Sequence, residues 1–196
     1  MNLRILAVDP GSIRHAVVVL NCDASQRVSY GGGAIYDLES VQLGEPAIAS
    51  IIETIEGYAF KGGAARVKDM VLTARNEGRI IERIIRARGP FPPPMTCSAG
   101  EARGALCRSG NASDAQVAIV VEALVHGAPK EMRKVDRQHI YDACLYGLYG
   151  LTKLGIALRL PPAAEAALHV QRERERAAAS AKGKATKARR QMGAFR

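Results

Sequence analysis

The hydrophobic pattern in the first part of the chain predicts short strands. Residues 3–9 and 15–20 are nearly continuous runs of aliphatic residues, and a tight turn joins them. A third run, residues 27–36, is interrupted by three consecutive glycines. Three short strands joined by turns are typical of an antiparallel meander. The next apolar stretch, residues 45–56, predicts either a short helix that leads into a strand or a single strand.

The later part of the chain has helical spacing. Residues 64–88 place aliphatic side chains three and four positions apart, and Gly89 and Pro90 are the expected stop signals. A short strand is predicted at residues 95–97, after a proline-rich linker. Further helices are predicted at residues 99–107, 113–126 and 135–157, and Ser113 can cap the second of them. Strands followed by helices in this order predict an α/β domain with a mixed sheet.

Asp9 stands at the end of the first predicted strand and is followed by Pro10 and Gly11. A core strand of a parallel sheet is normally apolar throughout, so a carboxylate there lies where the sheet meets a turn. Its desolvation costs free energy unless a cation or a hydrogen-bond donor pairs with it. The pattern therefore predicts either a metal ligand or an Asp that hydrogen-bonds its own turn.

A second acid follows the next apolar run. Glu53 comes directly after Ile51 and Ile52 and is expected to end a second apolar strand. Glu56 follows Ile55 in the same way, and two strand positions that are three apart face opposite sides of the sheet. The two glutamates are therefore alternatives, and we expect Glu53 to be the functional one because the run before it is more apolar.

Further candidate ligands lie near the start of the last predicted helix. His139 and Asp142 are three positions apart, so they share one face of that helix. The alternatives are a helix-surface histidine and an acid favoured by the helix dipole. An unpaired carboxylate in a helix this rich in Tyr, Leu and Cys would be costly, which favours a partner for Asp142. Asp136, one turn earlier, is either a further acid of the site or a helix-start residue.

These side chains together fit a site for Mg²⁺. The sheet edge and the helix start would bring together Asp9, Glu53, His139 and Asp142. Mg²⁺ prefers carboxylate oxygens, and two such ions about 4 Å apart can activate a water and stabilise the leaving oxygen of a phosphodiester. The sequence has no P-loop, no Gly-x-Ser-x-Gly and no His-Glu-x-x-His, so it offers little for rival chemistries.

The charge distribution indicates a polyanionic partner, with nucleic acid as the first candidate. The chain has 196 residues, 47% of them hydrophobic, and a formal net charge of +9. Residues 171–196 contain nine Lys or Arg and two Glu, so most of that charge lies in this segment. We expect a folded body over residues 1–160 and a basic, flexible tail over residues 161–196. This tail would be disordered or a frayed helix that binds phosphates without reading sequence; the alternative is a solubilising tail.

The cysteines and the hydrophobic segments indicate the cellular compartment in which the protein is expected. The four cysteines are too far apart for a Cys-x-x-Cys metal site, and there is no secretory signal. No apolar run reaches the roughly 18 residues of a membrane span. We therefore expect reduced thiols, a cytoplasmic location and no membrane partner.

Three segments resemble motifs of the RuvC Holliday junction resolvases, within the RNase H-like superfamily. Residues 5–12 (ILAVDPGS) resemble the first motif, residues 50–53 (SIIE) the second and residues 139–143 (HIYDA) the last, in the order of the family. The resemblance covers about residues 3–157. It implies an RNase H-like fold, with a mixed five-stranded sheet flanked by helices.

The resemblance also implies a crossover junction endodeoxyribonuclease. Asp9, Glu53, His139 and Asp142 would be its catalytic residues and metal ligands, for Mg²⁺ or for Mn²⁺ in its place. Its partners would be branched DNA, above all the Holliday junction, and a second copy of the chain in a homodimer. Cleavage would leave 5′-phosphate and 3′-hydroxyl ends. Small RuvC-like enzymes with basic additions occur in phages, so a phage-type enzyme in the cytoplasm of a bacterial or phage-infected cell is implied as well.

DNA contacts follow from the same resemblance. Arg103 lies where relatives carry a basic residue near the scissile phosphate, and Asp114 lies where they often have a second one. The loop and helix predicted after the second acid carry three more candidates for phosphate binding, for which the alternative is a solvated surface position. These are Lys61, Arg66 and Lys68.

Other functions are compatible with the same residues. A different RNase H-like nuclease, acting on RNA–DNA hybrids or flaps, would have the same sheet and the same acids. A non-catalytic nucleic-acid-binding protein would keep the fold and the basic tail but lose an acid, and none of the three motifs has lost one. A sugar-kinase-like ATPase shares the strand-one Asp-x-Gly pattern, but it needs a second glycine-rich phosphate motif and a longer chain.

Overall fold

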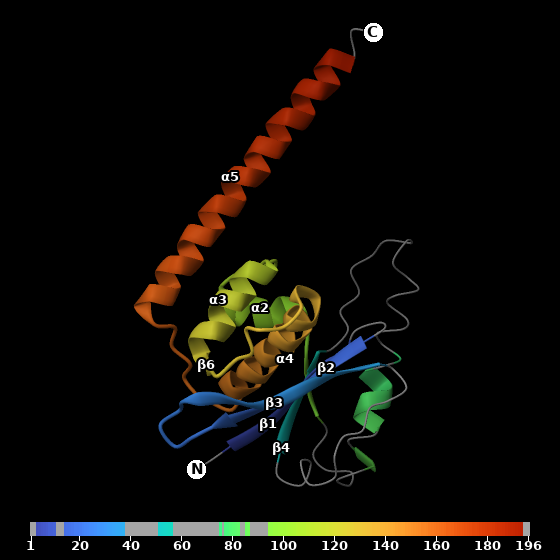
Figure 1. The fold of residues 1–196 in the computed structure, drawn as a ribbon, viewed down its shortest axis with the longest axis vertical. Coiled ribbons are helices and arrows are strands. Elements are labelled where there is room, and N and C mark those ends of the chain that lie inside the picture. The colour runs from blue at the N-terminus through green and yellow to red at the C-terminus, as the bar shows by residue number, and fades with distance from the viewer. Residues whose placement is uncertain are drawn as a thin grey trace.

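Strands from distant parts of the chain form one mixed sheet, and helices pack against it (Figure 1). The computed structural model describes residues 3–10, 14–37, 51–56, 75, 77–82, 85–86 and 94–193. For residues 51–56 and 183–193 it describes the backbone.

Six strands make up the sheet in this described part of the chain. They are β1 (Leu3–Asp9), β2 (Arg14–Cys22), β3 (Val28–Asp37), β4 (Ile51–Glu56), β5 (Met95–Cys97) and β6 (Val125–His126). Their order across the sheet is β5-β4-β1-β2-β3-β6. β1, β2 and β3 are antiparallel neighbours, whereas β4 is parallel to β1, β5 to β4 and β6 to β3. The predicted meander and the mixed sheet are confirmed.

The short strand β6 makes the sheet larger than the expected five strands. The helix expected to reach residue 126 ends at Leu124, because Val125 has an extended backbone with φ −106° and ψ 104°. Val125 then pairs with Val28 of β3. β6 consists only of Val125 and the exposed His126, and so short a segment gives no periodicity that distinguishes a strand from the end of a helix.

Three helices cover one face of the sheet: α2 (Ala99–Cys107), α3 (Asp114–Leu124) and α4 (Lys134–Lys153). α4 lies directly on β1 and β2, and α2 and α3 pack against α4. α2 begins with a capping box between Ser98 and Glu101. Ser113 caps α3 as predicted, since its side chain accepts a hydrogen bond from the backbone N–H of Gln116.

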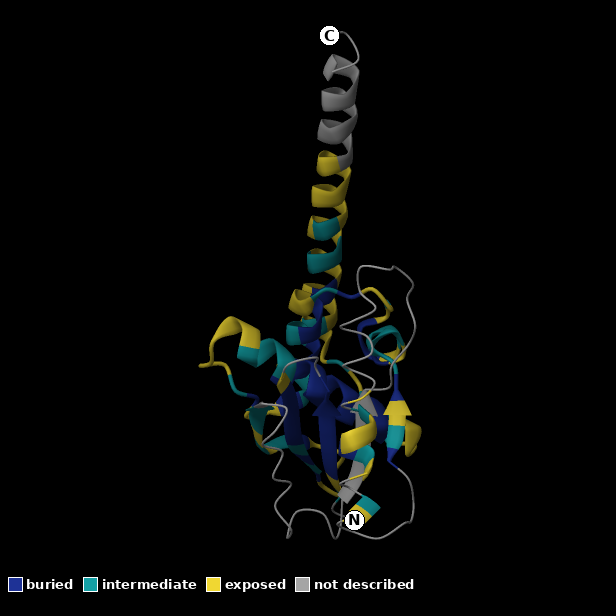
Figure 2. Ribbon diagram, turned by 90° about the vertical axis from the view of Figure 1, so that its right-hand side faces the viewer, coloured by how far each residue is buried: buried dark blue, intermediate teal, exposed yellow. Residues whose placement is uncertain are grey.

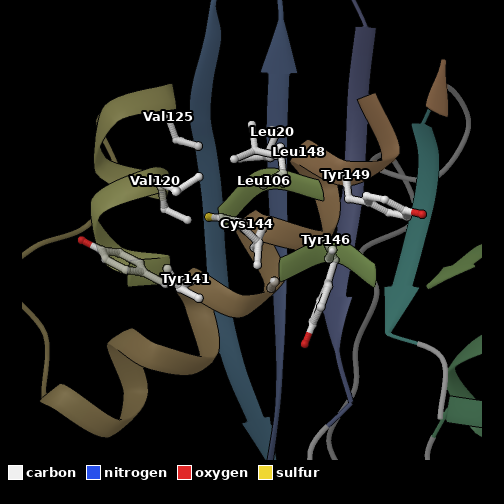
Figure 3. Packing of buried hydrophobic residues seen from close by; sticks show 14 of the residues in the cluster. Leu20, Leu106, Val120, Val125, Tyr141, Cys144, Tyr146, Leu148 and Tyr149 are labelled. Atoms are coloured by element: carbon white, nitrogen blue, oxygen red, sulfur yellow. The ribbon is translucent and has the colours of Figure 1, made fainter. Parts of the chain in front are cut away.

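The middle of α4 is buried on all sides. Residues 140–151 lie between the sheet and the outer helices, and Figure 3 shows side chains of α2, α3 and the strands around them. Gly147 allows α4 to approach the sheet closely, because a Cβ at this position would lie 2.8 Å from Leu20 Cδ1 and 3.1 Å from Ala7 Cβ. This close contact fixes the height of the α4 side chains above the end of β1.

The opposite face of the sheet carries a smaller apolar cluster. Leu6 and Val8 of β1 pack there with Ile80, which belongs to the helical residues 77–82. Ile5 lies instead in the large cluster that includes α4. Successive residues of β1 therefore alternate between the two faces, as in any strand.

The last helix, α5 (Pro162–Gly193), leaves the body of the protein (Figures 1 and 2). Its first turns pack on the outer helices: Leu168 is buried, and Arg172 donates a hydrogen bond to the backbone oxygen of Cys107. The side chains described from Arg176 onward are exposed. The first turns of α5 thus belong to the packed part of the protein. None of the described helices has the length and apolarity needed to cross a membrane.

Candidate functional site

Asp9 and His139 meet where the end of β1 faces the start of α4. Strand alternation places Asp9 on the same face as Ile5, which packs with α4. The Asp9 side chain is nearly buried, and its Oδ2 lies 2.8 Å from Nδ1 of His139. Two residues that are 130 positions apart in the sequence are thus in direct contact.

This contact changes the acid–base behaviour of the imidazole. The hydrogen bond to Asp9 raises the pKa of His139, burial opposes the rise, and the negative charges of Asp9, Asp142 and Asp136 reinforce it. The protonated imidazole is therefore favoured, and the contact with Asp9 fixes the orientation of the ring. One third of the His139 side chain (33%) stays exposed, so the ring is accessible from solvent.

Asp142 lies one turn further along α4 and is also buried. Its Oδ1 accepts a hydrogen bond from Nη2 of Arg103 at 2.9 Å, and its Oδ2 accepts one from Nε2 of Gln138 at 3.0 Å. Burial raises the pKa of Asp142, and the negative charge of Asp9 raises it further, against the opposing effects of Arg103 and Gln138. The ionised form of Asp142 is therefore disfavoured in these surroundings, and a bound cation would stabilise it.

Arg103 connects Asp142 to the loop between α2 and α3. Its guanidinium also donates to the backbone oxygen of Ala112 at 2.7 Å and lies 3.6 Å from a carboxylate oxygen of Asp114. Burial acts to lower the pKa of Arg103, but the charge of Asp142 and the hydrogen bond to it produce a net rise. Arg103, the residue predicted to contact DNA, thus lies at the candidate site, where its guanidinium interacts with Asp142 and Asp114.

Asp136 differs from the other acids in its partners. Its Oδ1 lies 3.1 Å from Nη1 of Arg14, and its Oδ2 lies 2.7 Å from Nε of Arg133. It stands in the first turn of α4, where the helix dipole favours an acid. Of the two interpretations of Asp136, the helix-start residue fits these contacts.

The register of β4 distinguishes the two candidate glutamates. Glu53 is paired with Leu6 of β1, which packs on the sheet face away from α4. The parallel ladder advances one residue at a time on each strand, so three steps later Glu56, the last residue of β4, is level with Asp9. Positions in register on parallel strands share a face of the sheet. The backbone therefore favours Glu56 over Glu53, against the preference drawn from the more apolar run.

The basic residues expected after the second acid lie outside the described part of the chain. These are Lys61, Arg66 and Lys68. Of the predicted helix over residues 64–88, the described residues 75, 77–82 and 85–86 are helical. Phosphate binding by the three basic residues stays a prediction.

Two polar partners of these acids were missed from the sequence. Gln138 lies four residues before Asp142, and this i,i+4 spacing on a helix is a signal that could have identified it. Arg14 comes from β2, and no local pattern relates it to Asp136, because their contact depends on how α4 crosses the sheet.

The donor set has the chemistry that a hard cation requires. Asp9 and Asp142 supply two buried carboxylates, and His139 contacts one of them. Among the side chains that the structure describes, no three His, Cys, Asp or Glu groups surround one point. A carboxylate from the end of β4 would complete a set of oxygen ligands of the kind that Mg²⁺ prefers.

Comparison with known proteins identifies the fold. No protein-family model matches the sequence, and no curated protein matches it. The structure is similar to that of Thermus thermophilus RuvC (TM-score 0.53, 14% identity, 79% of this chain and 98% of that chain). It is equally similar to T. thermophilus RuvC in complex with its Holliday junction substrate (TM-score 0.54, 16% identity, the same coverage). Ydc2, the yeast mitochondrial Holliday junction resolvase, also matches (TM-score 0.52, 11% identity, 74% of this chain and 76% of that chain). This chain has the RuvC fold.

Proposed function

We propose that this chain is a Mg²⁺-dependent, structure-selective endonuclease that resolves Holliday junctions and other branched DNA. The observation that carries the proposal is the pair of buried acids, Asp9 and Asp142, on facing elements of a RuvC fold. Two further facts support it: T. thermophilus RuvC, which shares the fold, forms a complex with a Holliday junction substrate, and Ydc2 is a Holliday junction resolvase. The net charge of +9 suits a polyanionic substrate.

The metal ligands would come from both elements of the site. Asp9, Asp142 and, by its register, Glu56 in preference to Glu53 would supply oxygen ligands, with His139 beside them as a further ligand or proton carrier. Mg²⁺, or Mn²⁺ in its place, would activate water and neutralise charge on the phosphodiester when bound. Arg103 would hold the Asp142 carboxylate in a fixed orientation through its hydrogen bond.

The geometry of a four-way junction requires two active sites. The junction presents two opposed strands, and one chain supplies one site, so the active form would be a homodimer that cuts the strands symmetrically. The basic C-terminal residues would add sequence-independent affinity for DNA. The enzyme would act in DNA recombination and repair in the cytoplasm of a bacterial or phage-infected cell.

A cleavage assay tests the function directly. A labelled four-way junction is compared with a linear duplex, a flap and an RNA–DNA hybrid, in Mg²⁺ and in EDTA. Paired nicks in opposed junction strands, abolished by EDTA, are the expected result. Cutting of the hybrid alone would indicate another RNase H-like nuclease instead of a resolvase. Binding without cutting of any substrate would indicate a non-catalytic DNA-binding protein.

A further inference from the structure

A polar pocket lies between α5 and the loop that joins α2 to α3. Its volume is about 370 Å³, within the range of ligand sites in proteins. Its wall includes three arginines, Arg108, Arg172 and Arg176, together with Asn111 and Gln116. The catalytic acids proposed above are not part of this wall.

The single carboxylate in the wall is already hydrogen-bonded. Glu175 accepts hydrogen bonds from Ser113 Oγ, Gln116 Nε2 and Gln171 Nε2. The bonds from Ser113 and Gln116 attach α5 to the start of α3, and the bond from Gln171 lies within α5, so the glutamate helps to build the pocket. The wall thus carries three guanidinium groups and one carboxylate, and two carboxylates outside the wall, Glu165 and Glu173, pair with Arg108 and Arg176.

Two buried polar atoms in the wall lack partners. Nε of Arg172 and Oε1 of Gln116 have no hydrogen-bond partner among the described residues. Arg172 is held in place by its hydrogen bond to the backbone oxygen of Cys107. Both unpaired atoms are covered by the surrounding protein, so ligand contacts in the pocket would come from its exposed guanidinium groups.

The other two arginines are available for a ligand. The side chains of Arg108 and Arg176 are 66% and 76% exposed, and their partners Glu165 and Glu173 also lie at the surface. Exposed ion pairs contribute little and exchange readily. Both guanidinium groups can therefore turn to phosphate oxygens, which they bind through paired hydrogen bonds.

The pocket and the candidate active site share one loop. Arg103 bonds both to Asp142 and to the backbone oxygen of Ala112, and the next residue, Ser113, bonds to Glu175 of α5. Asp114 follows, at the position where a basic residue was expected. This loop thus joins the candidate active site to the wall of the pocket.

We propose that this pocket binds backbone phosphates of a duplex arm of the DNA substrate, and that α5 supplies the positive charge that position 114 lacks. The proposal rests on the proposed function, because it assigns a second contact on the same DNA. It gives the first turns of α5 a defined place in substrate binding, separate from the exposed remainder of the helix.

Paired double variants of the full chain test the proposal. Arg108→Gln with Arg176→Gln removes two pocket charges, and Arg159→Gln with Arg174→Gln removes two exposed charges whose side chains lie outside this pocket. Affinity for a labelled four-way junction is measured by fluorescence anisotropy in EDTA over a series of salt concentrations, so that cleavage plays no part. Circular dichroism confirms that each variant is folded.

The pocket variant is expected to bind about tenfold more weakly than wild type at about 0.1 M salt, with a log–log salt slope smaller by about 2. The control variant should lose much less affinity. Equal losses in both variants, or no loss in either, would overturn the pocket while leaving wild-type cleavage and the proposed function intact. Failure of the wild-type chain to bind junctions would overturn both proposals.

Discussion

α4 carries proposed metal ligands and α5 carries proposed phosphate contacts, and the two helices are attached to the rest of the protein in different ways. α4 is buried over residues 140–151 and touches the sheet through apolar side chains. α5 is joined through its first turns, by Leu168 and by hydrogen bonds of Arg172 and Glu175, and then leaves the surface. Metal ligands need a geometry fixed by close packing, whereas a positive charge attracts phosphates over several ångströms. Each helix is held as tightly as its proposed task requires.

Asp9→Asn should have the largest effect on the α4 side of this comparison. Loss of one charged ligand should reduce junction cleavage by on the order of 10³-fold or more. DNA affinity should be unchanged or slightly higher, because a negative charge near the phosphates is removed. Single-turnover cleavage and anisotropy binding measure the two effects separately, and a variant that cuts normally would refute the metal-site assignment.

The two glutamates of β4 give a sharper test of the register. Glu56→Gln should lower cleavage by roughly 10²-fold or more, because its position is level with Asp9. Glu53→Gln is the matched control on the opposite sheet face and should retain most of the activity. The same cleavage assay compares them, and the reverse order of effects would restore Glu53 as the second acid.

Gly147→Ala tests how tightly α4 is packed. The added methyl group would meet Leu20 and Ala7 at 2.8 and 3.1 Å, and overpacking should lower the free energy of unfolding by about 1–2 kcal/mol. Gly104→Ala in α2 is the control, since its nearest neighbouring atom would be 3.9 Å away. There the better helix propensity should raise stability by about 0.5–1 kcal/mol. Urea unfolding measures both, and equal signs would contradict the close approach of α4.

The smallest predicted effect is the pH dependence of the attachment of α5 through Glu175. The hydrogen bonds from Ser113, Gln171 and Gln116 lower the pKa of Glu175 below its ordinary value of 4.5. Because its pKa is lowered, the ionised Glu175 carboxylate stabilises the packing of α5 fully at pH values above 4.5. This stabilisation is lost as the pH falls through the lowered pKa.

A tryptophan reporter measures this pH dependence. The chain has no Trp, so Val170→Trp on α5 provides a unique fluorescence signal. We expect a change in that signal below about pH 4.5 in the reporter protein. The change should be absent when Glu175→Gln is added, and an identical acid transition in both proteins would argue against this role of Glu175.

Local patterns predicted much of the fold. Apolar runs identified β1 and β2, and Ser113 was recognised as a helix cap. Asp9 and His139 were expected to lie together where the sheet edge meets the helix start, and the structure brings them into contact at 2.8 Å. Features that depend on the register between distant segments were not predictable in this way. The choice between Glu53 and Glu56 needs the pairing of β4 with β1, which leaves no trace in either strand alone.

The packing of α5 was missed for a related reason. Its composition is basic and rich in alanine, so nothing in that segment signals an apolar stripe that packs on the body. Its attachment depends on single polar residues, such as Glu175 and Arg172, whose partners lie on α2 and α3. Hydrophobic periodicity detects helices that bury a continuous face, and it does not detect one joined by a few hydrogen bonds.

The contact between Asp9 and His139 has a consequence for the chain during its synthesis. The first acid is synthesised 130 residues before its partner, which lies on a helix whose packing needs the rest of α4. A nascent chain that already exposes β1 therefore has no assembled site and would lack the proposed nuclease activity. Catalytic competence would appear late and all at once, when α4 closes over the sheet, and fragments that end before α4 would be inert.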